Sequence, residues 1–164
     1  MKTLMLLRHA KSGWKESDVP DHERPLNKRG KKTAPQMGRL LSASGLVPDL
    51  ILSSTAVRAR ETAKAVARAA SYQGPIELLE SLYLATAGKL LAEAQSHTPD
   101  SVGRLLLVGH NPGMEDLVAI LSGRREAFPT AALAVFEIGI NSWKALELGV
   151  STKLVNVYRP KEIL

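Results

Sequence analysis

The chain has 164 residues, 45% of them hydrophobic and 23% charged, a composition typical of one compact globular domain. Its formal net charge of +6 favours anionic partners such as nucleic acid, a membrane surface or a phosphorylated substrate. The absence of cysteine excludes a disulfide scaffold, a thiolate nucleophile and any cysteine-ligated metal site.

Strand-like and helix-like segments alternate through the first hundred residues. The apolar run at 3–7 predicts a strand that is buried on both faces, and a polar loop with Pro20 and Pro25 follows it. Segment 29–46 has apolar residues at helical spacing, and Gly45 is placed to end this helix. Further on, the pattern predicts a strand at 48–54, a helix at 56–70, a strand and loop at 75–83, and a helix at 88–97.

The later segments add a strand, a helix and a change of character. Segment 104–121 predicts a strand, a tight turn and a helix, with Asn111 as the N-cap and Pro112 at the first helical position. Residues 131–148 predict a β-hairpin with its turn near 139–142, and 153–160 predict a final strand. We therefore expect a single α/β domain over residues 1–164. Its architecture would be a three-layer α/β/α sandwich with a mostly parallel sheet and late antiparallel strands.

Two of the anionic partners are disfavoured by the sequence. Nucleic-acid binding through stacking usually needs exposed aromatic residues, and this chain has two Trp, three Tyr and two Phe, with no run of five basic residues. No apolar stretch approaches the roughly 20 residues needed to span a bilayer. We expect no nucleic-acid or membrane partner, and a cytoplasmic location.

Three predicted strand ends carry cationic or imidazole side chains. The first strand is followed by Arg8 and His9, the second by a segment with Arg58, and the fourth by His110. In an open α/β sheet, ligands bind beyond the carboxyl ends of the strands, so these side chains are expected to meet in one cavity. Guanidinium groups pair bidentately with phosphate oxygens, and helix N-termini add oriented N–H groups. The set therefore predicts a site for a tetrahedral oxyanion.

A metal site is the competing interpretation of this set. The four histidines, at 9, 22, 97 and 110, show no His-x-His or His-Glu-x-x-His spacing, and two arginines beside a cation would repel it. The sequence also has no Gly-x-Ser-x-Gly elbow and no Walker-type phosphate loop. We expect no metal and no cofactor, and histidine is the leading candidate nucleophile for phosphoryl transfer.

Three motifs in order resemble those of one enzyme family. "LLRHAKS" resembles the Arg-His-Gly/Ala signature of the histidine phosphatase (phosphoglycerate mutase-like) superfamily, and "VGHNP" resembles its second histidine motif. "SSTAVRARET" is similar to the family stretch Ser-x-x-x-x-Arg-Ala-x-x-Thr. The short length and "DHERPLNKRG" most resemble the SixA-type phosphohistidine phosphatases, which lack the long insertion of the mutases.

The resemblance implies a role for each motif residue. His9 would be the nucleophile, forming a phosphohistidine that water hydrolyses. Its ring would be neutral, with the other nitrogen donating to a backbone carbonyl. Arg8, Arg58 and His110 would hold the phosphoryl oxygens and stabilise the charge of an in-line transfer. Arg24 is a further candidate phosphate ligand, or else a loop arginine in water.

The general acid is the least defined part of the site. Hydrolysis of a phosphate ester needs a proton for the leaving oxygen, and the resemblance places Glu80 near the position of the acid in larger family members. Glu80 is equally well interpreted as a solvated loop residue. Asp18 and Asp21, in the loop after His9, are lesser candidates.

Other polar and aromatic residues near the motifs have simpler interpretations. Lys11 and Ser12 follow the signature closely and could touch phosphate. His22 and His97 are expected in surface loops. Trp14 would either wall the mouth of the pocket or cover an edge of the core.

The resemblance therefore implies a cofactor-independent phosphatase that hydrolyses phosphohistidine in proteins through a covalent intermediate on His9. A phosphorylated protein would be its partner, and the positive charge would attract an acidic one. A phosphatase for small phosphate esters or sugar phosphates is the alternative within the same superfamily. A non-catalytic phosphate-binding module is the alternative from another class.

Overall fold

The computed structural model describes residues 1–13 and 18–163. The strands are β1 (Lys2–Arg8), β2 (Leu50–Ser54), β3 (Ile76–Leu79), β4 (Arg104–Gly109), β5 (Leu133–Ile138) and β6 (Thr152–Tyr158). The α-helices are α1 (Lys28–Ala43), α2 (Val57–Ala69), α3 (Ala87–His97), α4 (Gly113–Ser122) and the short α5 (Pro160–Ile163). Three 3₁₀ turns are described: η1 (Asp21–Glu23), η2 (Glu80–Leu82) and η3 (Trp143–Ala145).

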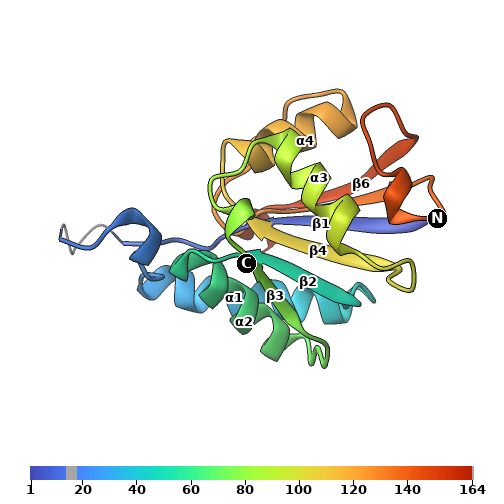
Figure 1. Cartoon of the computed structure of the whole chain (residues 1–164). Helices are drawn as coiled ribbons and strands as arrows, with labels where there is room; N and C mark the ends of the chain where they lie inside the picture. Colours follow the sequence, from blue (N-terminus) through green and yellow to red (C-terminus); the bar gives the residue numbers. More distant parts are fainter. Residues whose placement is uncertain (14–17, 164) are drawn as a thin grey trace.

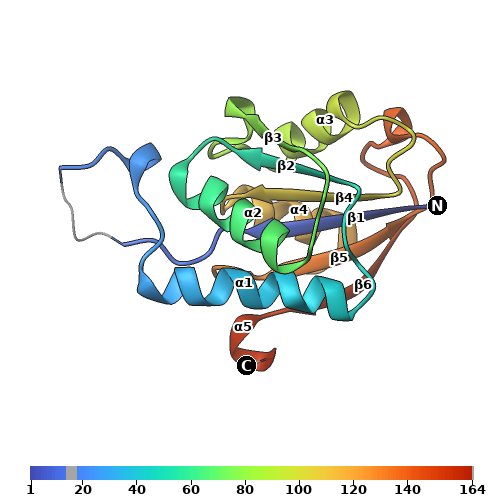
Figure 2. The ribbon, with the colours of Figure 1, turned by 90° about the horizontal axis from the view of Figure 1, so that it is seen from below.

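The strands form one six-stranded sheet in the order β3-β2-β4-β1-β5-β6. β1, β2, β3 and β4 pair in parallel, whereas β5 pairs antiparallel with β1, and β6 pairs antiparallel with β5. Helices α1 and α2 cover one face of the sheet, and α3 and α4 cover the other (Figures 1 and 2). The expected α/β/α arrangement, with a mostly parallel sheet and late antiparallel strands, is confirmed.

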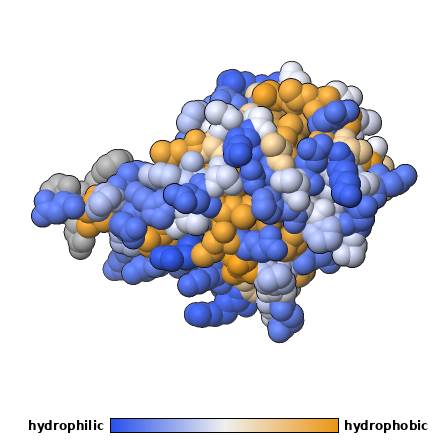
Figure 3. Space-filling view, in the orientation of Figure 1, coloured by the Kyte–Doolittle hydropathy of each residue, from blue (hydrophilic) through white to orange (hydrophobic). Residues whose placement is uncertain are grey.

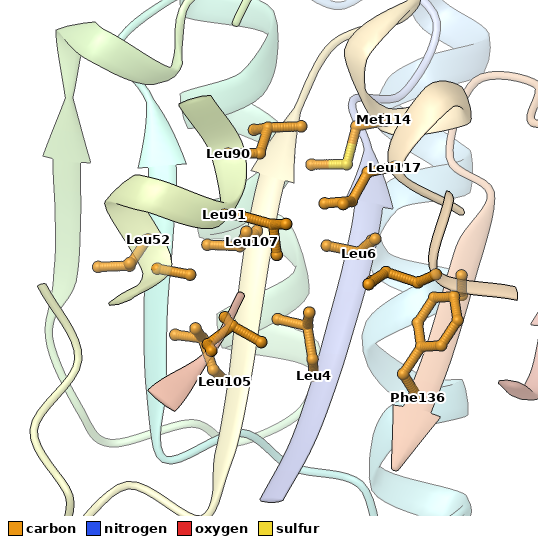
Figure 4. Close-up of a cluster of buried hydrophobic side chains, with 14 of the residues drawn as sticks. Leu4, Leu6, Leu52, Leu90, Leu91, Leu105, Leu107, Met114, Leu117 and Phe136 are labelled. Atoms are coloured by element: carbon orange, nitrogen blue, oxygen red, sulfur yellow. The ribbon is translucent and has the colours of Figure 1, made fainter. Parts of the chain in front are cut away.

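Burial on both faces explains why the central strands are continuously apolar. In β1, Leu4 and Leu6 belong to the core under α3 and α4, and Met5 and Leu7 belong to the core under α1 and α2. All four side chains are fully buried. Figure 4 shows the first of these cores, in which leucines from β1, β2 and β4 meet those from α3 and α4. The sheet is thereby fixed as a rigid platform for the loops that follow its strands.

Specific residues determine where α1 begins and ends and where α4 begins. The Asn27 side chain accepts a hydrogen bond from the Gly30 N–H and caps α1. Gly45 has a φ of 68°, the left-handed conformation that ends the run as predicted. α4 begins at Gly113, so Pro112 is at the N-cap and not at the first helical position as predicted. The side-chain Oδ1 of Asn111 still accepts from the N–H of Glu115, so Asn111 satisfies a backbone N–H at the start of the helix.

The predicted hairpin over 131–148 is wrong in its second arm. The chain does turn after β5, near 139–142, but the residues after the turn form η3. The antiparallel partner of β5 is β6, which starts at Thr152. Trp143 is fully buried and donates its indole N–H to the carbonyl of Val102 at 2.7 Å. The apolar residues after the turn therefore anchor a loop to the core and do not pair as a strand.

The described surface is mostly hydrophilic on the face shown in Figure 3, with apolar residues exposed in a few places. Over the whole described surface, the large exposed apolar side chains are Met1, Leu78, Leu84, Ile120, Leu148, Val155 and Ile163. Within the described residues, no helix combines the length and apolar character needed to cross a bilayer.

Candidate active site

The carboxyl ends of β1, β4 and β2 lie side by side and deliver the predicted residues to one pocket. Arg8 ends β1, His9 follows it, His110 follows β4, and Arg58 lies in the first turn of α2 after β2. The pocket has a volume of about 430 Å³. Its lining comprises Arg8, His9, Lys11, Ser12, Asp21, Arg24, Arg58, Leu84, His110, Asn111 and Thr130. The structure thus brings together the four residues that the sequence placed at separate strand ends, and Arg24 joins them.

His9 is held in one orientation and one tautomer. Its backbone N–H donates to the carbonyl of Gly109, and its ring Nδ1 donates to the carbonyl of Ala10 at 2.7 Å. The predicted ring-to-carbonyl hydrogen bond is confirmed, and it leaves the lone pair on Nε2. Burial, together with the charges of Arg58 and the other site arginines, lowers the pKa of His9 to about 4. The ring is therefore neutral at pH 7, as a nucleophile must be.

His110 lies beside His9, with ring centroids 5.1 Å apart, and is also buried. Burial, followed by the nearby His9 and Arg58, lowers the pKa of His110 to about 3. Its Nε2 lies 2.8 Å from the hydroxyl of Ser54, which itself accepts from the N–H of Ala56. The Ser54 hydroxyl has one hydrogen and a second lone pair, so it can pair with Nε2 in either neutral tautomer of the ring. Nδ1 is buried without a hydrogen-bond partner among the described residues.

Arg58 is only 3% exposed and is anchored on Asp21. Its terminal nitrogens donate to the Asp21 carbonyl at 2.7 Å and to the Asp21 carboxylate at 3.0 Å. Arg24 donates to the other carboxylate oxygen, and the Tyr83 hydroxyl donates to the first. Burial raises the pKa of Asp21, but the hydrogen bonds from Tyr83 and Arg58 outweigh it and lower the pKa to about 2. Asp21 is thus an ionised group that aligns two arginines.

The pocket holds donors that lack acceptors. The Nε groups of Arg8 and Arg58 and Nδ1 of His110 are buried with no hydrogen-bond partner among the described residues. An unmatched buried donor is costly, and charged donors bind oxyanions strongly. Arg24 is 8% exposed and also donates to the Ser12 hydroxyl at 2.8 Å. The arrangement therefore suits a tetrahedral oxyanion bound next to Nε2 of His9.

Thr62 links the loop after β1, which contains His9, to the helix that carries Arg58. Its hydroxyl accepts from the Ala10 N–H at 3.0 Å and donates to the Arg58 carbonyl at 2.7 Å. No role was predicted for Thr62 or for Ser54. Thr62 is the threonine of the Ser-x-x-x-x-Arg-Ala-x-x-Thr pattern, which could have identified it, whereas Ser54 occupies an unspecified position of that pattern.

The structure separates the candidate acids. Glu80 is exposed at the start of η2 and is not among the residues that line the pocket. Asp18 is exposed, whereas Asp21 lines the pocket in the ion pairs described above. Glu80 remains a prediction that its position does not favour.

Of the five other residues considered in the sequence, four lie in the described part of the chain. Lys11 and Ser12 line the pocket. His97 is exposed at the end of α3, where its ring contacts Glu93. His22 is half-buried, not simply in a surface loop as predicted, because its Nε2 lies 2.8 Å from the Thr55 hydroxyl. Trp14 lies outside the described residues.

The described residues contain no group of three or more His, Asp or Glu side chains placed to hold a metal ion. The groups that converge on the pocket are instead mostly arginines and neutral imidazoles, which are suited to anions.

The low pKa values of the two site histidines lead to a prediction about pH. We expect both rings to stay neutral down to about pH 5, since their pKa values are about 4 for His9 and about 3 for His110. A histidine in the unfolded chain titrates near pH 6.5, so the unfolded chain binds these protons at a higher pH than the folded chain. The free energy of unfolding therefore falls as the pH drops from about 6.5 through 4. Long-range ¹H–¹⁵N NMR spectra of the imidazoles across this range test the prediction. A His9 ring that becomes charged near pH 6.5 would contradict it.

Comparison with known proteins extends over nearly the whole chain. The model of the histidine phosphatase superfamily (branch 1) matches residues 4–127. An uncharacterized chloroplastic protein of Arabidopsis thaliana is 34% identical over 152 residues, which cover 87% of this chain and 69% of that protein. The structure of a candidate phosphohistidine phosphatase SixA from Agrobacterium tumefaciens is 31% identical, with a TM-score of 0.82 and coverage of 97% of this chain and 98% of that one. The protein histidine phosphatase SixA, solved with tungstate, has a TM-score of 0.83 at 21% identity over 99% of both chains, a likeness of fold.

Proposed function

Because the chain belongs to the histidine phosphatase superfamily, we propose that it hydrolyses phosphohistidine in proteins through a covalent intermediate on His9. The family and the SixA neighbours support a phosphatase. The covalent step, the role of each site residue and the phosphohistidine substrate are the proposal.

The reaction has two in-line steps. Nε2 of His9 attacks phosphorus, and the bond from phosphorus to the substrate imidazole breaks, with its electron pair leaving on the imidazole nitrogen. Water then attacks the phosphorus bound to His9, releases inorganic phosphate and restores the free ring. In both steps Arg8, Arg58 and His110, which line the pocket with His9, stabilise the charge that spreads over the phosphoryl oxygens.

The ionisation of Asp21 supports phosphohistidine over a phosphate ester as the substrate. An ester leaves as an alkoxide and needs a proton from a general acid, whereas imidazole is a far better leaving group. Among the described residues that line the pocket, Asp21 is the one carboxylate, and it is ionised and held by two arginines. Glu80 lies outside that lining. The pocket is therefore better suited to phosphohistidine than to a phosphate ester.

The substrate preference is tested by turnover in EDTA of a phosphohistidine-bearing protein beside a panel of small phosphate esters. We expect the phosphohistidine substrate to have a kcat/KM at least about 100-fold higher. A positioned general acid contributes about 10²–10⁴-fold to ester hydrolysis, and none is placed among the described residues that line the pocket. We expect Glu80→Gln to change either activity by less than about twofold, since the side chain is exposed outside the pocket.

Two outcomes would contradict this proposal. Preference for an ester, together with a loss of about 100-fold in Glu80→Gln, would assign the protein to small-ester chemistry with Glu80 as the acid. No turnover of any substrate and no phosphoenzyme would instead indicate a phosphate-binding module.

A further inference from the structure

A second pocket lies next to the catalytic one. Its volume is also about 430 Å³, and it shares Lys11 and Thr130 with the catalytic pocket. The first turns of α1 and the α5 segment form opposite walls, and these two helices lie beside each other in Figure 2. We call it the basic pocket, and it is lined by Lys11, Arg29, Thr33, Pro129, Thr130, Ala131, Arg159, Pro160, Lys161 and Glu162.

The lining of the basic pocket has an excess of positive charge. Arg159 is neutralised by ion pairs with Glu126 and with Glu162, the acid in the lining. Lys11, Arg29 and Lys161 are exposed, and none of them has an ion-pair partner among the described residues. The pocket therefore presents uncompensated cations to an incoming ligand.

The neighbouring turn of α1 increases this charge. Lys28, Arg29, Lys31 and Lys32 lie in the first five residues of the helix, and its first turn contains no acid. Cations at a helix N-terminus are opposed by the helix dipole, so this arrangement is unfavourable in the isolated protein. An anionic partner in the basic pocket would offset that repulsion.

The basic pocket is rigidly connected to the nucleophile. The N–H of Asn27 donates to the carbonyl of Lys11 at 2.9 Å. A Cβ on Gly30 would lie 2.1 Å from the same carbonyl, so only glycine allows α1 to pack this closely. Lys11 is two residues after His9, a span of at most about 7 Å. A residue two or three positions from a phosphohistidine held at His9 can therefore reach the basic pocket.

We propose that the basic pocket binds acidic side chains that flank the phosphohistidine of a protein substrate. The inference rests on the proposed function and names a feature of its substrate. The cations come from separate segments of the chain and are exposed, as suits several carboxylates along a peptide. A single small anion would instead need closely convergent, buried donors like those of the catalytic pocket.

The test uses two synthetic peptides phosphorylated on histidine with phosphoramidate. In one peptide, glutamates flank the phosphohistidine on both sides, and in the other, glutamines replace them. We expect wild type to show a several-fold lower KM for the glutamate peptide. Arg29→Gln and Lys161→Gln should each raise that KM by roughly threefold, and together by roughly tenfold, at unchanged kcat. High salt should abolish the difference.

Lys64→Gln and Arg68→Gln are the matched controls. Each removes one positive charge, as the test variants do, but from an exposed position on α2 that lines neither pocket. They should leave the ratio of the KM values for the glutamine and glutamate peptides unchanged. Hydrolysis of both peptides with equal KM would overturn this inference and leave the proposed function standing. Equal effects in the control variants would also overturn it, because they would indicate attraction by net charge alone. Failure of wild type to hydrolyse either peptide would overturn the proposed function, and this inference with it.

Discussion

The His9→Ala variant is expected to lose turnover of every phosphorylated substrate, with kcat lower by on the order of 10⁴-fold or more. In the proposed mechanism Nε2 of His9 carries the lone pair that attacks phosphorus, since Nδ1 is committed to the carbonyl of Ala10. The other imidazole in the pocket is not placed to replace it, because Nε2 of His110 is hydrogen-bonded to Ser54 and its Nδ1 is buried.

Rapid quenching and intact-mass measurement check this expectation. Wild type mixed with phosphoramidate should gain one phosphoryl group, and His9→Ala should gain none. Binding of tungstate by the variant is the control, because Arg8, Arg58 and Arg24 remain to hold an oxyanion. A phosphoenzyme of normal yield, or substantial activity in a clean preparation, would remove His9 from the role of nucleophile.

Arg58→Ala is expected to lower kcat/KM by about 10²–10³-fold, the usual loss for a preorganised charged donor. The guanidinium is buried, and its Nε lacks a partner among the described residues, so it is poised for the phosphoryl oxygens. The substitution also frees one side of Asp21, whose pKa of about 2 depends partly on this arginine. The carboxylate then repels the phosphate that Arg58 would have attracted.

Steady-state kinetics and vanadate binding together test the role of Arg58. Vanadate affinity should fall along with kcat/KM, whereas Arg68→Ala, on an exposed part of the same helix, should match wild type. Arg58→Lys should restore little, because a lysine cannot reproduce two parallel N–H groups aimed at Asp21. Unchanged vanadate affinity in Arg58→Ala would place Arg58 outside the phosphate site.

Strands and helices with a single dominant pattern could be predicted from the sequence. β1 and β4 have continuous apolar runs, at 4–7 and 105–108, because both faces are covered, and α2 has one stripe of small apolar residues in the core. The segment after β5 could not be predicted in the same way. The burial of Trp143 depends on the carbonyl of Val102, and its backbone N–H donates to Asp100, a partner more than forty positions away.

The site was predictable where strand ends define it and less so elsewhere. Arg8, His9 and His110 directly follow or end buried strands, so the sheet alone fixes their meeting. The place of Asp21 depends on η1 packing against the start of α2, a contact with no local signature. The resemblance placed Glu80 ahead of Asp21 as the candidate acid, and only the tertiary contacts show that Asp21 lines the pocket and Glu80 does not.

The central position of β1 has a consequence for synthesis of the protein. β1, the strand that precedes His9, is made early, yet its Leu4 pairs with Leu105 on one side and Phe136 on the other. At ordinary translation rates, the ribosome needs about 5 to 20 s to make the roughly 100 residues that separate β1 from β4. During that interval an apolar strand with two unpaired edges has none of its native neighbours. Nascent chains of this protein are therefore expected to engage chaperones, and the pocket assembles only after β5 has been made.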